Sequence, residues 1–109
     1  MSARVYFIAG GPGDKPGTVL VKVGHTSQAT ESRLKQLQTG SAQPLRVVCE
    51  FFVKDKSTAA LGERWFKRVF TEGGCHVAGE WFLFKERLVR DLEQIRRDAK
   101  LRGEVPFGS

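Results

Sequence analysis

Near the N-terminus, two runs of β-branched and aromatic residues stand on either side of a short segment rich in glycine and proline. The first run spans residues 4–9, the second spans residues 18–24, and turn formers dominate residues 10–17 between them. Such runs favour strands, and a loop this short joins neighbouring antiparallel strands. The sequence therefore predicts an antiparallel β-hairpin. The glycine-rich segment has no Gly-Lys-Ser/Thr ending and leads into a strand, so it is not a phosphate-binding P-loop.

The middle of the chain predicts a helix followed by a strand. Residues 30–39 are helical in pattern, with Ser27 or Thr30 available to cap the start and Gly40 placed to end it. Residues 45–53 form an apolar run that is long enough for a central strand.

A second helix is expected to be capped by Ser57 and to run to about Phe70. At roughly 100° per residue, its apolar residues fill one continuous arc: Ala59, Leu61, Trp65, Phe66, Val69 and Phe70. Glu63 falls at the margin of this arc, and the opposite face is basic, with Arg64, Lys67 and Arg68. A carboxylate at the edge of a buried aromatic face must be paired or bind a metal ion. Glu63 is therefore a candidate ligand for a hard cation such as Mg²⁺, with a salt bridge to a nearby Arg or Lys as the alternative.

The remaining third of the chain begins with a break at residues 72–75. Residues 80–84 are short and aromatic, which indicates a strand or an extended docking segment. The last helix is expected over residues 85–101, ended by Gly103, with one apolar face made of Leu88, Leu92, Ile95 and Ala99. The predicted order is β-β-α-β-α-(β)-α in a single domain, with a core over residues 4–84 and a loose tail over residues 103–109.

Composition excludes several classes of protein. The chain has 109 residues, which is one domain's worth, and no apolar run approaches the roughly 20 residues of a membrane span. The N-terminus lacks the apolar stretch of a signal peptide, and two cysteines are too few for a disulfide scaffold. We expect a basic cytoplasmic domain. Its net charge of +6 points loosely to a polyanionic partner.

Four residues of the first half could carry chemistry. Tyr6 and Lys22 lie on adjoining strands of the hairpin, where either could take a proton from water, although Tyr6 could instead pack in the core and Lys22 face solvent. His25 follows a strand end, a common place for site residues, but matches no zinc-binding spacing. Arg33 could bind a phosphate or could be a solvated helix arginine.

Together these residues resemble the GIY-YIG endonuclease superfamily, and more closely its short phage- and bacterial-type branch, in which the second motif often reads Lys-Ile-Gly. The matching segments are Val5-Tyr6-Phe7-Ile8, Val21-Lys22-Val23-Gly24-His25-Thr26, Arg33-Leu34-Lys35-Gln36-Leu37-Gln38-Thr39-Gly40-Ser41, Pro44-Leu45, Glu63 with Phe70, and Gly79-Glu80-Trp81-Phe82. Each segment is unspecific, whereas their order and spacing together are fairly specific.

The resemblance implies an α+β fold with a small three-stranded antiparallel sheet flanked by helices. It implies that Tyr6 contacts or helps to activate the nucleophilic water and that Arg33 faces the scissile phosphate. It also implies that Glu63 binds one divalent ion, Mg²⁺ or Mn²⁺. His25 lies where relatives often place a polar or basic residue near the phosphate.

The chain departs from the family pattern at three positions. Arg4 stands where the first motif has glycine, and Lys22 replaces the tyrosine of the second motif. The general base is therefore Tyr6 or Lys22. Lys67 stands where short-branch relatives often have a histidine, four residues after the glutamate.

These residue types suit hydrolysis of a phosphodiester bond, which needs an activated water, a cation and a positive group on the phosphate oxygens. The leading prediction is a metal-dependent endonuclease that acts on DNA, and RNA is not excluded as a substrate. Four basic residues are expected to bind the nucleic-acid backbone: Lys35, Arg64, Lys67 and Arg68. The alternative is a non-catalytic nucleic-acid-binding module on the same fold. A weaker possibility is a protein partner bound through aromatic residues near Trp81. A homodimer or a targeting protein would suit so small a domain, and no membrane association is expected.

Overall fold

The computed structural model describes residues 2–103 of the chain. Its elements are β1 (Ala3–Pro12), β2 (Thr18–Thr26), α1 (Thr30–Thr39), β3 (Arg46–Val53), α2 (Lys56–Glu72), β4 (His76–Ala78), β5 (Trp81–Lys85) and α3 (Glu86–Leu101). The predicted α+β class is confirmed. Apart from Gly103, the predicted tail lies outside the described residues. None of the helices over residues 2–103 combines the length and the apolar character needed to cross a membrane.

The strands form one antiparallel sheet in the order β3-β1-β2-β5-β4. The expected three-stranded sheet is wrong, because the sheet has five strands over residues 2–103. The aromatic segment pairs with β2 as β5, and the residues between the predicted break and this segment form β4. Gly79 allows this last hairpin, since its φ of 55° lies in the left-handed region that favours glycine. The predicted N-terminal hairpin is confirmed, with Tyr6 opposite Gly24.

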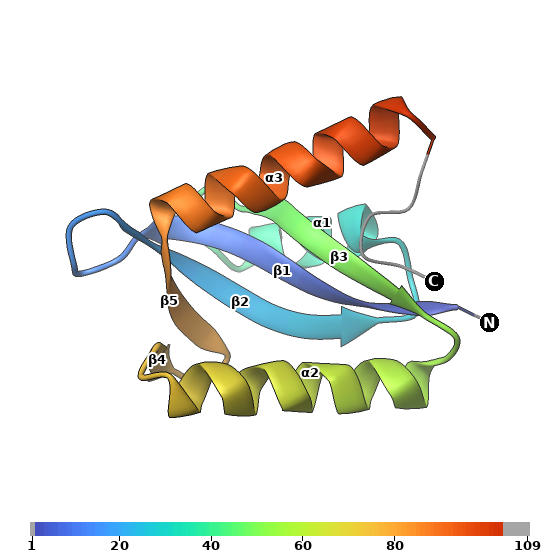
Figure 1. Cartoon of the computed structure of the whole chain (residues 1–109), viewed down its shortest axis with the longest axis horizontal. Helices are drawn as coiled ribbons and strands as arrows, with labels where there is room; N and C mark the ends of the chain where they lie inside the picture. The colour runs from blue at the N-terminus through green and yellow to red at the C-terminus, as the bar shows by residue number, and fades with distance from the viewer. Residues whose placement is uncertain (1, 104–109) are drawn as a thin grey trace.

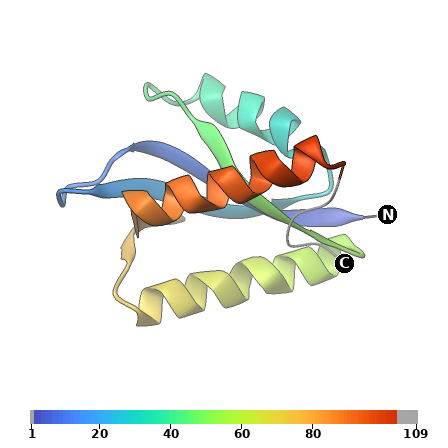
Figure 2. The same cartoon turned by 45° about the horizontal axis from the view of Figure 1, so that its top comes forward.

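The helices cover both faces of the sheet. In Figure 1, α2 lies on one side of the sheet and α3 lies on the other. Figure 2 shows α1 beside α3, and the Nη2 atom of Arg96 on α3 lies 2.6 Å from Oε1 of Glu31 on α1. Because successive side chains of a strand point to opposite faces, Val5 and Phe7 face α2, whereas Tyr6 faces α1 and α3.

Aromatic rings fill the space between the sheet and α2. The ring centroid of Phe7 lies 5.1–5.8 Å from the centroids of four other rings, all in edge-to-face arrangements: Phe51, Phe66, Phe70 and Phe84. Gly62 brings the helix backbone close to the sheet, since a Cβ there would lie 3.0 Å from Cγ2 of Val5. This packing fixes the position of α2, and therefore of Glu63, relative to β2.

Only part of the predicted apolar arc of α2 is buried. Ala59, Phe66 and Phe70 pack into the core, whereas Leu61 and Trp65 are 60% and 51% exposed. A helix that lies on a sheet buries one stripe of its surface, and the predicted arc is wider than that stripe. The buried face of α3 also differs from its predicted apolar face. Val89, Leu92 and Ala99 face the core, whereas Leu88 and Ile95, which were predicted to do so, are exposed.

The helix starts differ from the predicted caps. α2 begins at Lys56, and the carboxylate of Asp55 accepts a hydrogen bond from the backbone nitrogen of Thr58 at 2.8 Å. Ser57, the predicted cap, therefore lies inside the first turn. The N-cap residue of α1 is Ala29, so neither Ser27 nor Thr30 caps this helix as predicted. The carboxylate of Asp55 carries a charge and therefore accepts a stronger hydrogen bond than a serine hydroxyl does, which is consistent with the earlier start of α2.

Candidate active site at the end of strand β2

β2 is longer than β5, the strand that pairs with it on the side away from β1. β5 pairs with residues 18–22 of β2, and beyond this pairing the backbone nitrogen of Val23 donates to the carbonyl of Glu80 at 3.3 Å. In the described part of the chain, residues 24–26 extend past β5. The residues predicted for catalysis gather around this end of β2.

Tyr6 lies over Gly24 on the face of the sheet that carries α1. Its ring is 2% exposed, and its Oη lies 3.5 Å from Nε of Arg33, which donates to it. A Cβ on Gly24 would lie 2.3 Å from the same Oη, so glycine leaves the space that the ring occupies. The Tyr6 ring therefore packs in the core, as one reading of the sequence predicts, while its hydroxyl contacts the predicted phosphate-binding arginine.

His25 and Glu63 form a pair on the face that carries α2. His25 is the partner of Val5 across the hairpin and so shares its face. The Nδ1 atom of His25 lies 2.8 Å from Oε1 of Glu63, with the two side chains 27% and 17% exposed. A carboxylate only accepts, so Nδ1 carries the hydrogen and Nε2 is the ring nitrogen left to face a ligand.

Lys67 connects Glu63 to the edge of the sheet. Its Nζ lies 2.7 Å from Oε2 of Glu63 and 3.1 Å from Oε1 of Glu80. Lys22 donates to the other carboxylate oxygen of Glu80. These four residues, Lys22, Glu63, Lys67 and Glu80, are called the ion-pair cluster below.

The ion-pair cluster shifts the pKa of two of its members. Burial raises the pKa of Glu80, but the hydrogen bonds and charges of Lys22 and Lys67 outweigh it and hold the pKa below its ordinary value. Burial lowers the pKa of Lys67, but the hydrogen bonds and charges of Glu63 and Glu80 outweigh it and raise the pKa above its ordinary value. Both groups are therefore charged at neutral pH.

A polar cavity of about 230 Å³ brings the two halves of the site together. It is lined by His25, Thr26, Ser27, Gln28, Arg33, Gln36 and Lys56. His25 from β2, Arg33 from α1 and Lys56 from α2 contribute basic groups to this one surface. Charge-assisted donors that converge on a polar hollow suit an anion such as a phosphate.

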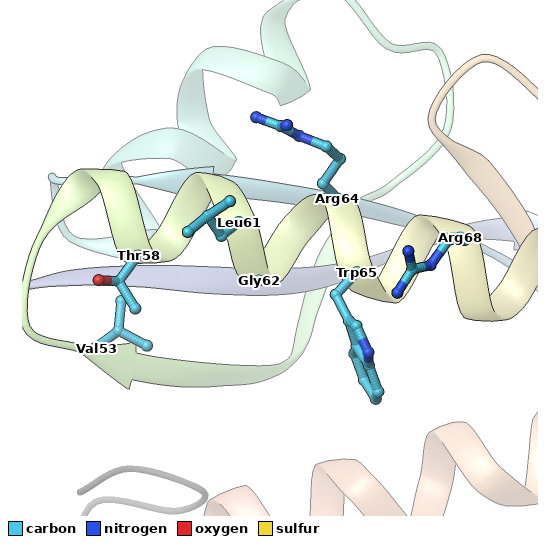
Figure 3. A pocket seen from close by; sticks show the side chains of 7 residues that line it. All are labelled: Val53, Thr58, Leu61, Gly62, Arg64, Trp65 and Arg68. Carbon is cyan, nitrogen blue, oxygen red and sulfur yellow. The ribbon is translucent and has the colours of Figure 1, made fainter.

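The four residues predicted to grip nucleic acid lie in different settings. Lys67 is not on an exposed basic face, because it is bound in the ion-pair cluster with only 24% of its side chain exposed. Arg64 and Arg68 are exposed, and both line a second, apolar cavity of about 630 Å³ that also includes Leu61 and Trp65. Figure 3 shows Arg64 and Trp65 pointing to opposite sides of α2. Because Arg64 and Arg68 line the same cavity as Leu61 and Trp65, basic and apolar residues share the exposed surface of α2, and the prediction of two opposite faces is wrong. The fourth residue, Lys35, is exposed on α1.

Glu80 and Lys56 were not predicted as site residues. Glu80 lies in the quoted segment Gly79-Glu80-Trp81-Phe82, so the motif itself was a signal, whereas nothing in the sequence marked Lys56.

Trp81 is half-buried rather than exposed, because its ring packs on Gly10, where a Cβ would lie 3.1 Å from the ring. Gly10 belongs to β1, which continues to Pro12, past the predicted end at Ala9.

The divalent ion implied for Glu63 does not fit the side chains as they are arranged. The two carboxylate oxygens already accept hydrogen bonds from His25 and Lys67. A second cation at the same carboxylate would be repelled by the Lys67 ammonium. Across residues 2–103, no group of three or more His, Cys, Asp or Glu side chains could hold a metal ion. An ion on Glu63 would therefore require Lys67 to move away.

No protein-family model, no curated protein and no solved structure matches the chain. The likeness to GIY-YIG endonucleases therefore depends on the sequence motifs, and the function depends on the geometry at the end of β2.

Proposed function

We propose that the chain is an endonuclease that hydrolyses phosphodiester bonds in DNA, as its resemblance to the GIY-YIG superfamily implies. One observation carries the proposal: residues predicted for catalysis from separate segments meet at the end of β2. Arg33 contacts Tyr6, and His25 contacts Glu63. Arg33 and His25 line the same polar cavity, and Lys22 joins Glu63 through Glu80 and Lys67.

In the proposed reaction, Arg33 binds the non-bridging oxygens of the scissile phosphate and stabilises the charge that develops on them. Tyr6 accepts a hydrogen bond from Nε of Arg33, which fixes the direction of the guanidinium. The water oxygen forms a bond to phosphorus while the bond to the leaving ester oxygen breaks. The leaving oxygen keeps the electron pair and takes up a proton from solvent, while the proton of the attacking water goes to the base.

The geometry favours His25 over Tyr6 or Lys22 as the base that takes the proton from water. Lys22 donates to Glu80, and the Tyr6 hydroxyl accepts from Arg33. His25 lines the cavity beside Arg33, and Glu63 holds its ring through Nδ1. An imidazole oriented by a carboxylate at one nitrogen is arranged to accept a proton at the other.

A non-catalytic nucleic-acid-binding module is the second candidate. The specific observation in its favour is that both oxygens of Glu63 are engaged within the protein. Basic residues around the cavity would then bind the phosphate backbone, and the affinity would fall steeply with salt. Binding to RNA, a homodimer or targeting partner, and a cytoplasmic location remain predictions from the sequence.

Cleavage assays on supercoiled plasmid and branched DNA, in Mg²⁺, Mn²⁺ or EDTA, test the proposal. We expect Arg33→Ala and His25→Gln each to lower the cleavage rate by about 100-fold or more, because each removes a group that acts in the transition state. Matched controls are Arg97→Ala, an exposed arginine on α3, and His76→Gln, an exposed histidine on β4. Both controls should cleave at the wild-type rate.

Two outcomes would count against the endonuclease. In the first, Arg33→Ala and His25→Gln cleave as fast as wild type. In the second, purified wild-type protein binds DNA in a salt-dependent manner and cleaves none of the substrates under any of the three conditions. The second outcome would favour the binding module.

A further inference from the structure

Lys67 lies between two carboxylates that come from different parts of the fold. Its Nζ is 2.7 Å from Oε2 of Glu63, one turn earlier on α2, and 3.1 Å from Oε1 of Glu80, just before β5. An ordinary salt bridge along a helix needs only the first of these contacts. The second contact places the ammonium where two acidic side chains converge, which is the setting in which proteins hold divalent cations.

The charges of the ion-pair cluster are already balanced. Lys22 and Lys67 provide two positive charges, and Glu63 and Glu80 provide two negative charges. A divalent ion at Glu63 would add two positive charges next to the Lys67 ammonium without any uncompensated carboxylate to receive them. Because the side chains of Lys67 and Glu63 are only 24% and 17% exposed, water screens this repulsion incompletely.

The other oxygen of Glu63 accepts from Nδ1 of His25. With Lys67 on one oxygen and His25 on the other, the plane of the carboxylate is fixed from both sides. Glu63 is thereby placed to orient the imidazole rather than to bind an ion.

We propose that Lys67 takes the place of a divalent cation at Glu63, so that the native site holds no divalent ion and Glu63 serves as the positioning residue of His25. Only one consequence rests on the proposed endonuclease: cleavage of DNA at this site persists in EDTA. The placement of Lys67 itself is tested without any measurement of activity.

Calorimetric titration with Mn²⁺ tests the placement of Lys67. Wild-type protein should show no saturable binding. Lys67→Met should bind one Mn²⁺ per chain, at least about tenfold more tightly than any weak affinity of wild type, because two carboxylates are then left with one ammonium. Lys67→Arg keeps the charge and should behave as wild type does. Lys35→Met is the matched control, since it removes an exposed lysine and the same charge, and it should not create a site.

A double variant and a folding measurement complete the test. Glu63→Gln added to Lys67→Met should abolish the binding gained, and circular dichroism should show that each variant is folded. If Lys67→Met does not fold, Lys67→Gln takes its place in the same titration. The proposal is overturned if wild type binds Mn²⁺ as tightly as the Lys67 variant, or if a folded Lys67 variant gains no site.

Nuclear magnetic resonance of the two histidine rings gives a second readout. His25 donates from Nδ1 to Glu63, whereas Nε2 of His76 donates to the carbonyl of Gly79 at 2.9 Å. The neutral rings should therefore be opposite tautomers, and Glu63→Ala should release only that of His25. Added Mg²⁺ should leave the His25 resonances of wild type unmoved, and a saturable shift would contradict the proposal.

The two proposals can fail separately. A wild-type chain that binds no Mn²⁺ and cleaves no DNA contradicts the endonuclease and supports the placement of Lys67. A wild-type chain that binds Mn²⁺ at Glu63 and cleaves only with that ion supports the endonuclease and overturns the placement of Lys67.

Discussion

Gly24 determines how closely Tyr6 can approach β2. A Cβ at this position would lie 2.3 Å from Oη and 2.4 Å from Cζ of Tyr6, closer than non-bonded atoms allow. Gly24→Ala should push the ring away and destabilise the protein by about 1–3 kcal/mol, as extra atoms in a packed site do. Urea denaturation measures this loss in the free energy of unfolding.

Gly40→Ala is the matched control for this substitution. Gly40 ends α1 with φ of −96°, a value open to any residue, and a Cβ there would meet no atom within 4 Å. This variant should be as stable as wild type or more stable by up to about 1 kcal/mol, because alanine restricts the unfolded chain. Equal losses in the two variants would show that glycine at position 24 is not required by the Tyr6 ring.

Single residues also show how far the sequence can predict the site. The position of Glu63 at the margin of the apolar arc indicated that its carboxylate must be paired or bind a metal, and the structure pairs it with His25 and Lys67. Lys67, four residues later, could be anticipated as a partner from helix geometry. The pairing of Lys22 with Glu80 could not, since 58 residues separate them and the order of the strands brings them together.

At the scale of the elements, local signals predicted the helix boundaries to within about two residues; α2 runs on to Glu72, past its predicted end at Phe70. The bounds Thr30–Thr39 of α1 agree with the prediction, because Gly40 ends the helix. The start of α2 was misplaced because both Asp55 and Ser57 are common capping residues. The strand β4 was missed because it has only three residues and pairs only with β5, so neither its composition nor its length marks it.

The cap of α2 yields a prediction that separates the two candidate residues. Asp55→Ala should lower the urea midpoint of unfolding, whereas Ser57→Ala should leave it unchanged, because only Asp55 accepts the hydrogen bond of Thr58. The hydrogen bonds from Thr58 and, to a smaller extent, the charge of Lys54 lower the pKa of Asp55 below its ordinary value. A lowered pKa adds stability above the ordinary pKa, and that stability is lost as the pH falls through the lowered one.

The midpoints of wild type and Asp55→Ala should therefore differ at neutral pH and converge in acid. Asp55→Asn keeps an acceptor for the Thr58 N–H and should remain close to wild type at neutral pH. A larger loss in Ser57→Ala than in Asp55→Ala would contradict the observed cap.

For the whole molecule, the sheet has two differently used faces. Figure 1 shows α2 on one face and α3 on the other. The aromatic rings pack on the α2 face, whereas Tyr6 lies on the opposite face, where its hydroxyl contacts Arg33 of α1. The candidate site forms where β2 extends past β5, so that groups from both faces reach one cavity. The sequence pattern predicted the strands and the apolar faces, but it could not predict how far β5 would cover β2, because that depends on pairing between distant segments.

The distribution of the net charge of +6 over this shape gives the last prediction. Arg64 and Arg68 are exposed on α2, whereas Arg87 and Arg97 are exposed on α3, across the sheet. The logarithm of the DNA affinity falls linearly with the logarithm of the salt concentration, with a slope of about −0.9 for each phosphate contact. If Arg64 and Arg68 contact phosphates, replacing both with alanine should make the slope shallower by about 2. Fluorescence anisotropy on a duplex oligonucleotide measures the slope, and Arg87→Ala with Arg97→Ala, which removes the same charge, should leave it unchanged. If both double variants flatten the slope equally, the charge acts through its total, and the idea that α2 grips the backbone is wrong.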